Sequence, residues 1–256
     1  MIKKATRAAL ARLGYELRRS EPAGRADGGL ARSMSDVLAL ASRLGVQPAT
    51  VIDVGVAAGT PELYRAFPQA ALVLVEPLEE FAESCAAALA SRRGVSVLAA
   101  AGPADGTATL NVHVDHLDGS SLFPETMGPG FDGRQRPIST VRIDTVVRES
   151  GFQGPFVLKV DVQGAELEVL DGAPRTLLDC QLVLLEVSLY EFMRGAPQLG
   201  DVVGYMADRA FSVFDIFGGI FRPLDGALGQ IDIAFAQDDS HLRSSHCWAA
   251  TEGIAP

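Results

Sequence analysis

Short apolar runs alternate with segments of helical periodicity from about residue 35 onward. The apolar runs are nearly continuous, as is typical of strands buried on both faces, and occupy 50–55, 71–77, 95–101, 155–162 and 181–188. Segments with helical spacing or composition lie among them at 78–93, 164–170 and 199–210. This regular alternation of strand and helix segments along the chain predicts a doubly wound α/β fold with a parallel sheet. Ligands of such a fold bind at the carboxyl ends of the strands.

Local end signals predict two further helices. Ser35 is a suitable N-cap for the sequence DVLALASRL, and Gly45 is a suitable stop after it. Thr60, Pro61 and Glu62 supply an N-cap, an N1 proline and an early acid for a helix that follows the first strand.

Two regions predict antiparallel strands, the first from alternating apolar and polar positions and the second from two apolar runs that lie close enough along the chain to pair. Residues 107–114 follow an Asp-Gly turn and predict an added hairpin or edge strand, while 211–217 and 231–237 predict a hairpin at one edge of the main sheet. The expected core is therefore a seven-stranded, mostly parallel sheet with an antiparallel C-terminal edge hairpin. Residues 115–137 have no periodicity and are rich in glycine, so we expect a lid or binding loop.

Charge divides the chain unevenly. Eight of the 22 basic residues fall within the first 32 positions, and the remainder of the chain has 14 basic and 29 acidic side chains, a net charge of −15. This strongly acidic part of the chain repels the phosphate backbone of a nucleic acid. The charge therefore disfavours a nucleic-acid substrate and favours a small-molecule or glycan acceptor. We expect a basic segment and linker at 1–33, a catalytic domain at 34–240 and a tail at 241–256.

The N-terminus and the cysteines indicate the compartment. The apolar stretch within residues 1–19 is interrupted by arginines and is too short for a signal peptide or a membrane span. It would suit a basic amphipathic helix on a membrane surface or partner, or a solvated terminus. Cys85, Cys180 and Cys247 are widely spaced and form no metal-binding motif, so we expect a reduced, cytoplasmic protein without zinc.

The strongest chemical motif follows the first strand. Asp53, Gly55 and Gly59 form D-x-G-x-x-x-G, in which the glycines allow a tight turn close to a ligand. A dinucleotide fingerprint requires G-x-G-x-x-G, so this spacing disfavours NAD. An acid at this place suits a cationic methionine amine and favours S-adenosylmethionine.

Acids also end the later strands. Glu76 closes the second strand, where a carboxylate accepts hydrogen bonds from the ribose hydroxyls of an adenosine. Asp161 closes another and is a candidate proton acceptor, while Glu186 is expected in the acceptor site. With Glu166 these last two acids would offer carboxylates to Mg²⁺, but Glu166 equally suits ordinary helix capping, and a metal site is not favoured.

The remaining candidates lie in and near the long loop. His113 and His116 flank its start and are alternative proton acceptors, although exposed loop histidines are the commoner case. Ser120 and Ser121 within the loop, and Tyr190 after a strand end, are expected to contact the acceptor.

These motifs together resemble the FkbM-type methyltransferases. The segments VIDVGVAAGT, LVEP, DGTATL, DGSSLF, VRIDTVV, LKVDVQGAELEVLDGA and LLEVS occur in that family's order over about residues 50–188. The resemblance implies a Rossmann-like class I methyltransferase fold, S-adenosylmethionine as cofactor and O-methylation of a sugar or secondary metabolite. Asp53, Gly55, Gly59 and Glu76 match its cofactor motif, and Asp161 and Glu166 match its central block.

Two departures from the family pattern affect the site. Gln163 stands where many members have Glu, which weakens the case for a metal, and Val56-Ala57-Ala58 replaces the commoner Ala-Asn-x. Two alternatives remain at this point: a nicotinamide oxidoreductase on the same fold, and a cofactor-binding partner subunit without turnover.

Overall fold

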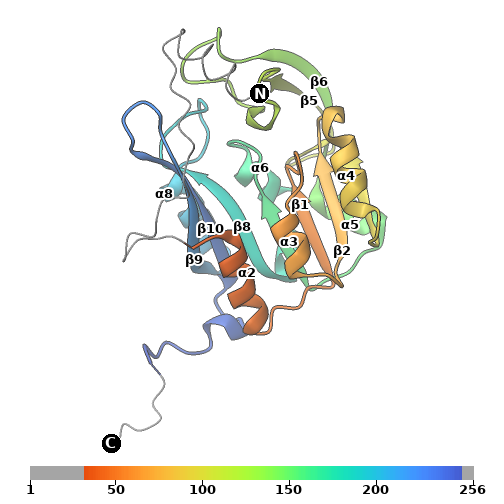
Figure 1. Ribbon diagram of the computed structural model, residues 1–256, viewed down its shortest axis with the longest axis vertical. Helices are drawn as coiled ribbons and strands as arrows, with labels where there is room; N and C mark the ends of the chain where they lie inside the picture. Colours follow the sequence, from red (N-terminus) through yellow and green to blue (C-terminus); the bar gives the residue numbers. More distant parts are fainter. Residues whose placement is uncertain (1–31, 250–256) are drawn as a thin grey trace, which may run out of the picture. The chain divides into compact units, whose positions relative to one another are not determined.

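The computed structural model describes residues 32–249, and its centre is a seven-stranded sheet (Figure 1). The strand order is β3-β2-β1-β7-β8-β10-β9. These strands span Gly94–Leu98 (β3), Ala71–Glu76 (β2), Thr50–Val54 (β1), Phe156–Val160 (β7), Cys180–Ser188 (β8), Leu228–Gln237 (β10) and Phe211–Phe221 (β9). The first five strands in this order run parallel to one another. β10 is antiparallel to both of its neighbours, β8 and β9, which confirms the predicted sheet and its edge hairpin.

The strand order reverses between β1 and β7. From β1 the chain proceeds outward through β2 to β3, and it later returns to place β7 on the other side of β1. In an open α/β sheet this reversal leaves a crevice at the carboxyl ends of the two central strands. The loops that follow β1 and β7 are therefore the expected walls of a ligand site.

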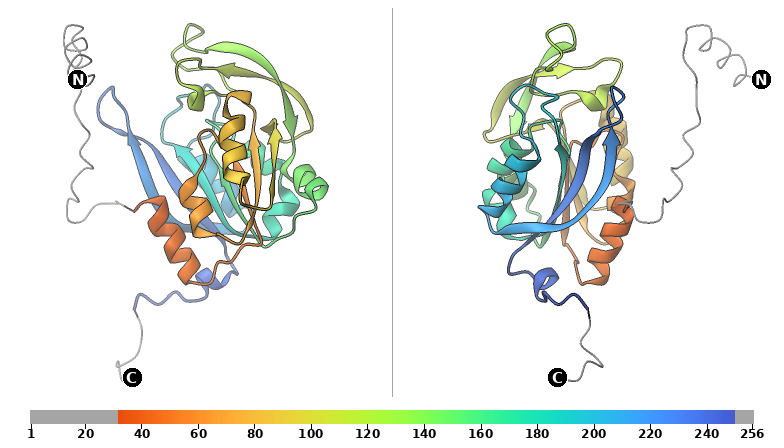
Figure 2. Two further views of the ribbon diagram at one scale, coloured as in Figure 1. Left: turned by 45° about the vertical axis from the view of Figure 1, so that its right-hand side comes forward. Right: turned by 90° about the vertical axis from the view of Figure 1, so that its left-hand side faces the viewer.

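Helices cover both faces of the sheet, as Figure 2 shows from two sides. The helices are α2 (Met34–Arg43), α3 (Pro61–Ala66), α4 (Ala82–Leu89), α5 (Ile143–Ser150), α6 (Glu166–Asp171), α7 (Pro174–Leu178) and α8 (Leu199–Ala207). One core joins α2, α3 and α4 to one face of the sheet, and a second core joins α5, α6, α7 and α8 to the other. Because successive side chains of a strand point to opposite faces, the same apolar strands supply both cores.

The first described helix begins earlier than its sequence signal suggested. Ser33, rather than Ser35, is the N-cap: its hydroxyl accepts from the Asp36 backbone N–H, and the Asp36 carboxylate accepts from the Ser33 N–H. This reciprocal pair satisfies two backbone donors, which a cap at Ser35 would leave without partners. The predicted stop is supported, since Gly45 follows the C-cap with a φ of +102°.

A second, three-stranded sheet rises beside the carboxyl end of the main sheet. Its order is β4 (Ala100–Ala101), β6 (Arg134–Val141) and β5 (Gly106–Val112). The antiparallel β5–β6 pair confirms the added hairpin predicted from the alternation at 107–114. Two expectations are corrected: the single strand at 95–101 is divided between the two sheets, and the last four residues of the supposed loop at 115–137 belong to β6.

A 3-10 turn, η1 (Glu79–Phe81), precedes α4, and two more are η2 (Leu117–Gly119) and η3 (His241–Arg243). Within residues 32–249, no helix is long and apolar enough to cross a membrane. The basic segment predicted at the N-terminus and most of its linker lie outside the described residues.

Candidate active site

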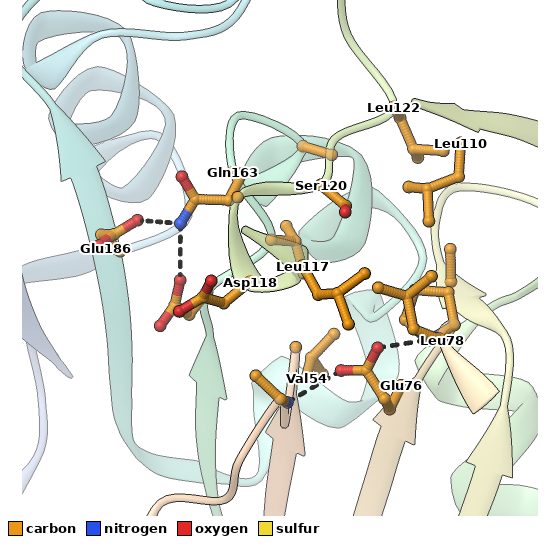
Figure 3. A pocket seen from close by; sticks show the side chains of 18 of the residues that line it. Val54, Glu76, Leu78, Leu110, Leu117, Asp118, Ser120, Leu122, Gln163 and Glu186 are labelled. Atoms are coloured by element: carbon orange, nitrogen blue, oxygen red, sulfur yellow. Dashed lines mark hydrogen bonds between the residues drawn. The ribbon is translucent and has the colours of Figure 1, made fainter. Parts of the chain in front are cut away.

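A cavity of about 300 Å³ opens at the carboxyl ends of β1, β2, β7 and β8 (Figure 3). This volume is at the lower end of the range of roughly 300–1,000 Å³ found for small-molecule sites. Leucines of η2, β5 and the segment after β2 form one side, and Gln163 and Glu186 lie on the other. The cavity lies where the strand order reverses, as the sheet topology requires.

The glycine-containing turn after β1 forms part of the cavity wall. Gly55 has a φ of +73°, and a Cβ there would lie 1.8 Å from the carbonyl oxygen of Asp161, so only glycine fits. Ala57 also has a positive φ, of 44°, at the place where relatives commonly have Asn, a residue that tolerates this conformation better. Gly59, with a φ of +95°, shapes the turn but does not line the cavity.

Glu76 ends β2 and points toward this turn. Its carboxylate accepts from the backbone N–H groups of Ala57 and Leu78, each at 2.9 Å. Burial raises the pKa of Glu76, and these two hydrogen bonds oppose the rise. The carboxylate therefore holds the turn against β2 and keeps lone pairs available to a diol in the cavity.

Asp53 is completely buried and does not line the cavity. Its carboxylate accepts from the Tyr64 hydroxyl of α3 at 2.5 Å and lies 3.2 Å from the ammonium of Lys159. In this geometry Asp53 supports the turn from beneath, and direct contact with the cofactor amine stays a prediction. The raised pKa of the Tyr64 hydroxyl comes from burial and from the Asp53 charge.

Lys159 is a functional candidate that motif reasoning missed. Its ammonium lies between Asp53 and Asp161, at 3.2 and 3.4 Å, and donates to the carbonyl of Gly55 at 3.2 Å. Burial alone would lower the lysine pKa, but the two carboxylates outweigh burial and raise it. A signal was present, because a lysine inside the apolar run FVLKV must be paired if that strand is buried.

Asp161, directly after β7, and Glu186 of β8 both line the cavity. The Gln163 side-chain amide donates to both, at 3.2 Å to Asp161 and 2.7 Å to Glu186. Gln230 of β10 donates to the same Glu186 oxygen at 3.0 Å. Burial and then the charge of Asp161 raise the pKa of Glu186 to about 8.

The residues Asp161, Gln163, Glu186 and Gln230 all line the cavity, and we call them the polar wall. Gln230 and its strand neighbour Asp232, which does not line the cavity, were not predicted. Asp232 pairs in register with Glu186 across the antiparallel strands, and burial raises its pKa to about 6. Their signal was the polar residues at every second position of GQIDIAF. Only the register of β10 against β8 places them beside the site.

Glu166 is buried outside the cavity lining. It starts α6 and accepts from the Gly164 backbone N–H at 3.0 Å, which matches the capping interpretation. Burial raises its pKa to about 7. Residues 32–249 contain no group of three or more His, Cys, Asp or Glu side chains arranged to hold a metal ion.

The loop candidates divide into two groups. His116 and Ser120 line the cavity, and the His116 imidazole lies 3.0 Å from the Asp118 carboxylate. His113, Ser121 and Tyr190 do not line it. The His113 imidazole lies 3.8 Å from Glu125, and Tyr190 lies beneath the Arg222 guanidinium.

Ser121 instead connects the loop to the central block. Its hydroxyl donates to the Gln163 carbonyl at 2.7 Å and accepts from the Phe123 backbone N–H at 3.0 Å. Gln163 has a φ of 56°, so this bond lies beside a strained turn. Ser121 therefore positions the polar wall rather than contacting the cavity.

The chemistry of the cavity fits an adenosyl sulfonium cofactor. Leu78, Phe81 and Leu117 offer an apolar wall for a flat base, Glu76 offers acceptors for a ribose diol, and the acid-lined end suits a cation. We assign Gly55 and Ala57 to the backbone side of that site. The fold and the cavity together define an α/β enzyme that binds a nucleoside cofactor at its topological switch point.

Comparison with known proteins gives the family. The family model described as "Methyltransferase FkbM domain" matches residues 53–213. This chain belongs to the FkbM methyltransferase family and is an S-adenosylmethionine-dependent methyltransferase. The resemblance in its motifs is thereby confirmed, and methyl transfer replaces the nicotinamide and non-enzymatic alternatives. No curated protein matches the sequence.

Three of the solved structures that resemble this chain are the following. One is 1,6-didemethyltoxoflavin-N1-methyltransferase of Burkholderia thailandensis, with 13% identity, a TM-score of 0.43 and coverage of 92% of this chain and 87% of that one. Precorrin-6y C5,15-methyltransferase of Geobacter metallireducens GS-15 has 12% identity, a TM-score of 0.40 and coverage of 82% and 92%. Magnesium protoporphyrin IX methyltransferase of Synechocystis PCC 6803 has 10% identity, a TM-score of 0.42 and coverage of 79% of each chain.

Proposed function

We propose that this enzyme methylates a hydroxyl oxygen of a sugar, a glycan or a small secondary metabolite. The observation that carries the proposal is the polar wall of the cavity: the carboxyl groups of Asp161 and Glu186, joined by the amides of Gln163 and Gln230. Carboxyl groups and amides exchange hydrogen bonds with neutral hydroxyls, and the Asp161 carboxylate repels phosphate or carboxylate groups. A neutral, hydroxylated acceptor is the class that this wall favours.

The chain's task is alignment, exclusion of water and removal of one proton. Bound S-adenosylmethionine supplies a methyl group that is already activated by the sulfonium. Asp161 is our proposed proton acceptor, since it lines the cavity and its carboxylate is held by Gln163 and Lys159. The high pKa of Glu186 makes it a hydrogen-bond donor at neutral pH, which orients an acceptor oxygen beside Asp161.

The loop histidines take second place in this scheme. His116 lines the cavity but three quarters of its side chain is exposed, at 75%. Good proton transfer requires a base held in contact with the acceptor hydroxyl while water is excluded. His116 is therefore the alternative base, and it depends on movement of its loop toward the substrate. His113 would need a larger movement, because it lies against Glu125 outside the cavity.

Composition supports the remaining parts of the proposal. The acidic body favours a small-molecule or glycan acceptor over nucleic acid. Three free cysteines suit the reducing cytoplasm, where we place the enzyme. Contact of residues 1–19 with a membrane surface belongs to the same proposal.

The test is direct detection of the methylated product. We would incubate the full chain with isotopically labelled S-adenosylmethionine and with glycan and metabolite extracts, then identify labelled species by mass spectrometry. Label on an ether oxygen supports the proposal, and label confined to nitrogen or carbon contradicts it. Asp161→Asn is expected to abolish turnover and leave S-adenosylhomocysteine affinity within a few-fold, whereas the exposed-residue control Asp208→Asn keeps both.

A further inference from the structure

Large apolar side chains are exposed at the end of β9 and on the turn that connects it to β10, and the first of them lines the cavity. Ile220, Phe221 and Leu224 have exposed fractions of 56, 65 and 83%. We call these three residues the apolar rim. Single exposed apolar residues are common on protein surfaces, but three on one hairpin, the first of them lining a cavity, form a candidate binding surface.

The backbone of β9 explains why neighbouring residues of the rim are both exposed. Gly218 and Gly219 have φ values of 64° and 133°, and the pairing of β9 with β10 shifts register between Gln230 and Asp232. A β-bulge shifts the phase of the side-chain alternation that follows it. The register of β8 with β10 also ends at Ser188 and Gln230, so the hairpin residues beyond this point extend past the main sheet and are exposed on both faces. Figure 1 shows this hairpin extending beyond the main sheet at the end where the parallel strands terminate.

The rim is continuous with the polar wall. Ile220 pairs in register with Gln230, and both residues line the cavity. The Gln230 amide in turn donates to Glu186. A molecule whose hydroxyl lies against Glu186 and Gln230 therefore meets Ile220 next. Phe221 and Leu224 follow Ile220 along the same hairpin, outside the cavity lining.

Polar contacts of Arg222 connect the hairpin to the segment after β8. The Arg222 guanidinium lies over the Tyr190 ring at 4.1 Å and forms a 2.6 Å ion pair with Asp225. The Leu189 backbone N–H donates to the Gly229 carbonyl at 2.8 Å, which connects the same segment to the hairpin a second time. The apolar side chains are thus presented on a supported hairpin rather than on an isolated loop.

We propose that the acceptor is amphipathic: its hydroxylated part enters the cavity, and an alkyl or aryl part lies along the apolar rim. This inference rests on the proposed function and specifies its substrate class. The occupant is argued from continuity, since the rim begins at a residue that already lines the cavity. Other exposed apolar residues of the described chain, such as Leu98 and Leu178, neither line the cavity nor lie on the hairpin that carries Ile220.

The experiment compares two probes with the same head group. Binding of n-octyl β-D-glucoside, kept below its micelle concentration, and of methyl β-D-glucoside is measured by calorimetry on the full chain saturated with S-adenosylhomocysteine. The octyl glucoside is expected to bind at least about tenfold more tightly, a gain that burial of about two methylene groups provides. Equal affinities for the two probes would overturn the proposal.

Variants then locate the apolar contact. Phe221→Ser combined with Leu224→Ser is expected to reduce the preference for the octyl probe to about threefold or less, and the exposed control Leu178→Ser is expected to retain it. A preference unaffected by the rim variant, or lost equally in the control, contradicts the proposal. Circular dichroism and thermal unfolding of both variants exclude a folding defect as the cause.

A membrane is the competing occupant and is tested separately. The full chain is sedimented with phosphatidylcholine and phosphatidylglycerol vesicles, with and without the rim substitutions. Vesicle binding that the rim variant abolishes, together with equal affinity for the two glucosides, would assign the rim to lipid surfaces and overturn our proposal. Because these measurements need no turnover, a failure of O-methylation would leave their outcome readable.

Discussion

The ammonium of Lys159 lies 3.2 Å from the carboxylate of Asp53, its register partner on the adjacent strand. Lys159 is the only lysine among residues 32–249 and also lies 3.4 Å from Asp161. One buried cation thus joins the strand before the cofactor turn to the proposed proton acceptor. Its contact with the Gly55 carbonyl adds the turn itself to this network.

Replacing Lys159 by Met is expected to destabilise the protein by about 3–5 kcal/mol, because it leaves two buried or half-buried carboxylates without their counterion. Urea unfolding at neutral pH measures this loss. S-adenosylhomocysteine affinity is expected to fall with it. The double variant Lys159→Met with Asp53→Asn should recover part of the stability, since it removes both buried charges. The coupling would be contradicted by a double variant that is as unstable as Lys159→Met alone, or by one whose loss of stability equals the sum of the two single losses.

Glu76→Gln is expected to weaken S-adenosylhomocysteine binding by about ten- to a hundredfold, corresponding to the loss of a charge-assisted hydrogen bond of about 1.5–3 kcal/mol. One backbone donor, from Ala57 or Leu78, also loses its acceptor. Calorimetry of the two proteins gives the ratio. Glu79→Gln, an exposed acid three residues further on, is the matched control and should bind normally. Unchanged affinity in Glu76→Gln would exclude the ribose role.

Stability is expected to fall as pH rises from about 5 to 8. Glu186 and Asp232 have pKa values raised to about 8 and about 6, whereas an unfolded chain has ordinary carboxyl values. The folded state binds more protons in this window, so the free energy of unfolding decreases by up to about 1.4 kcal/mol per pH unit for each such group. Below about pH 4 both states are protonated and this stabilisation is complete.

Urea unfolding over a pH series checks this dependence. Glu186→Gln should flatten the decrease between pH 5 and 8, because the carboxyl with the largest rise is gone. Glu149→Gln changes an exposed helix residue and should leave the slope as it is. Stability that increases with pH over this window would show that Glu186 and Asp232 are ionised in the folded protein.

Gln163→Glu is expected to destabilise this protein by about 1–3 kcal/mol at pH 8. The amide that now donates to Asp161 and Glu186 would become a third acid between them. Protonation relieves the repulsion, so the loss should shrink toward pH 5. Thermal unfolding at both pH values measures it, with exposed Gln153→Glu as control. A loss that is independent of pH would point to packing instead.

Much of the fold was predictable from pattern alone. Continuous apolar runs at 50–55, 71–77 and 155–162 indicated strands buried on both faces, and the observed sheet has them at its centre. The glycine spacing after Asp53 distinguished this turn from a dinucleotide site. These signals are local: they depend on the periodicity of the backbone and on conformations that only glycine adopts readily.

Which side chains meet was decided by tertiary structure. Asp53 and Glu76 both end parallel strands, yet Asp53 points under α3 to Tyr64 and Glu76 lines the cavity. Gln230 approaches Glu186 only through the register of antiparallel strands more than forty residues apart in sequence. The sequence by itself determined the elements, the turn chemistry and the family motifs. The polar wall, the Lys159 network and the apolar rim required the fold, because long-range register and burial set the neighbours and the charge state of each group.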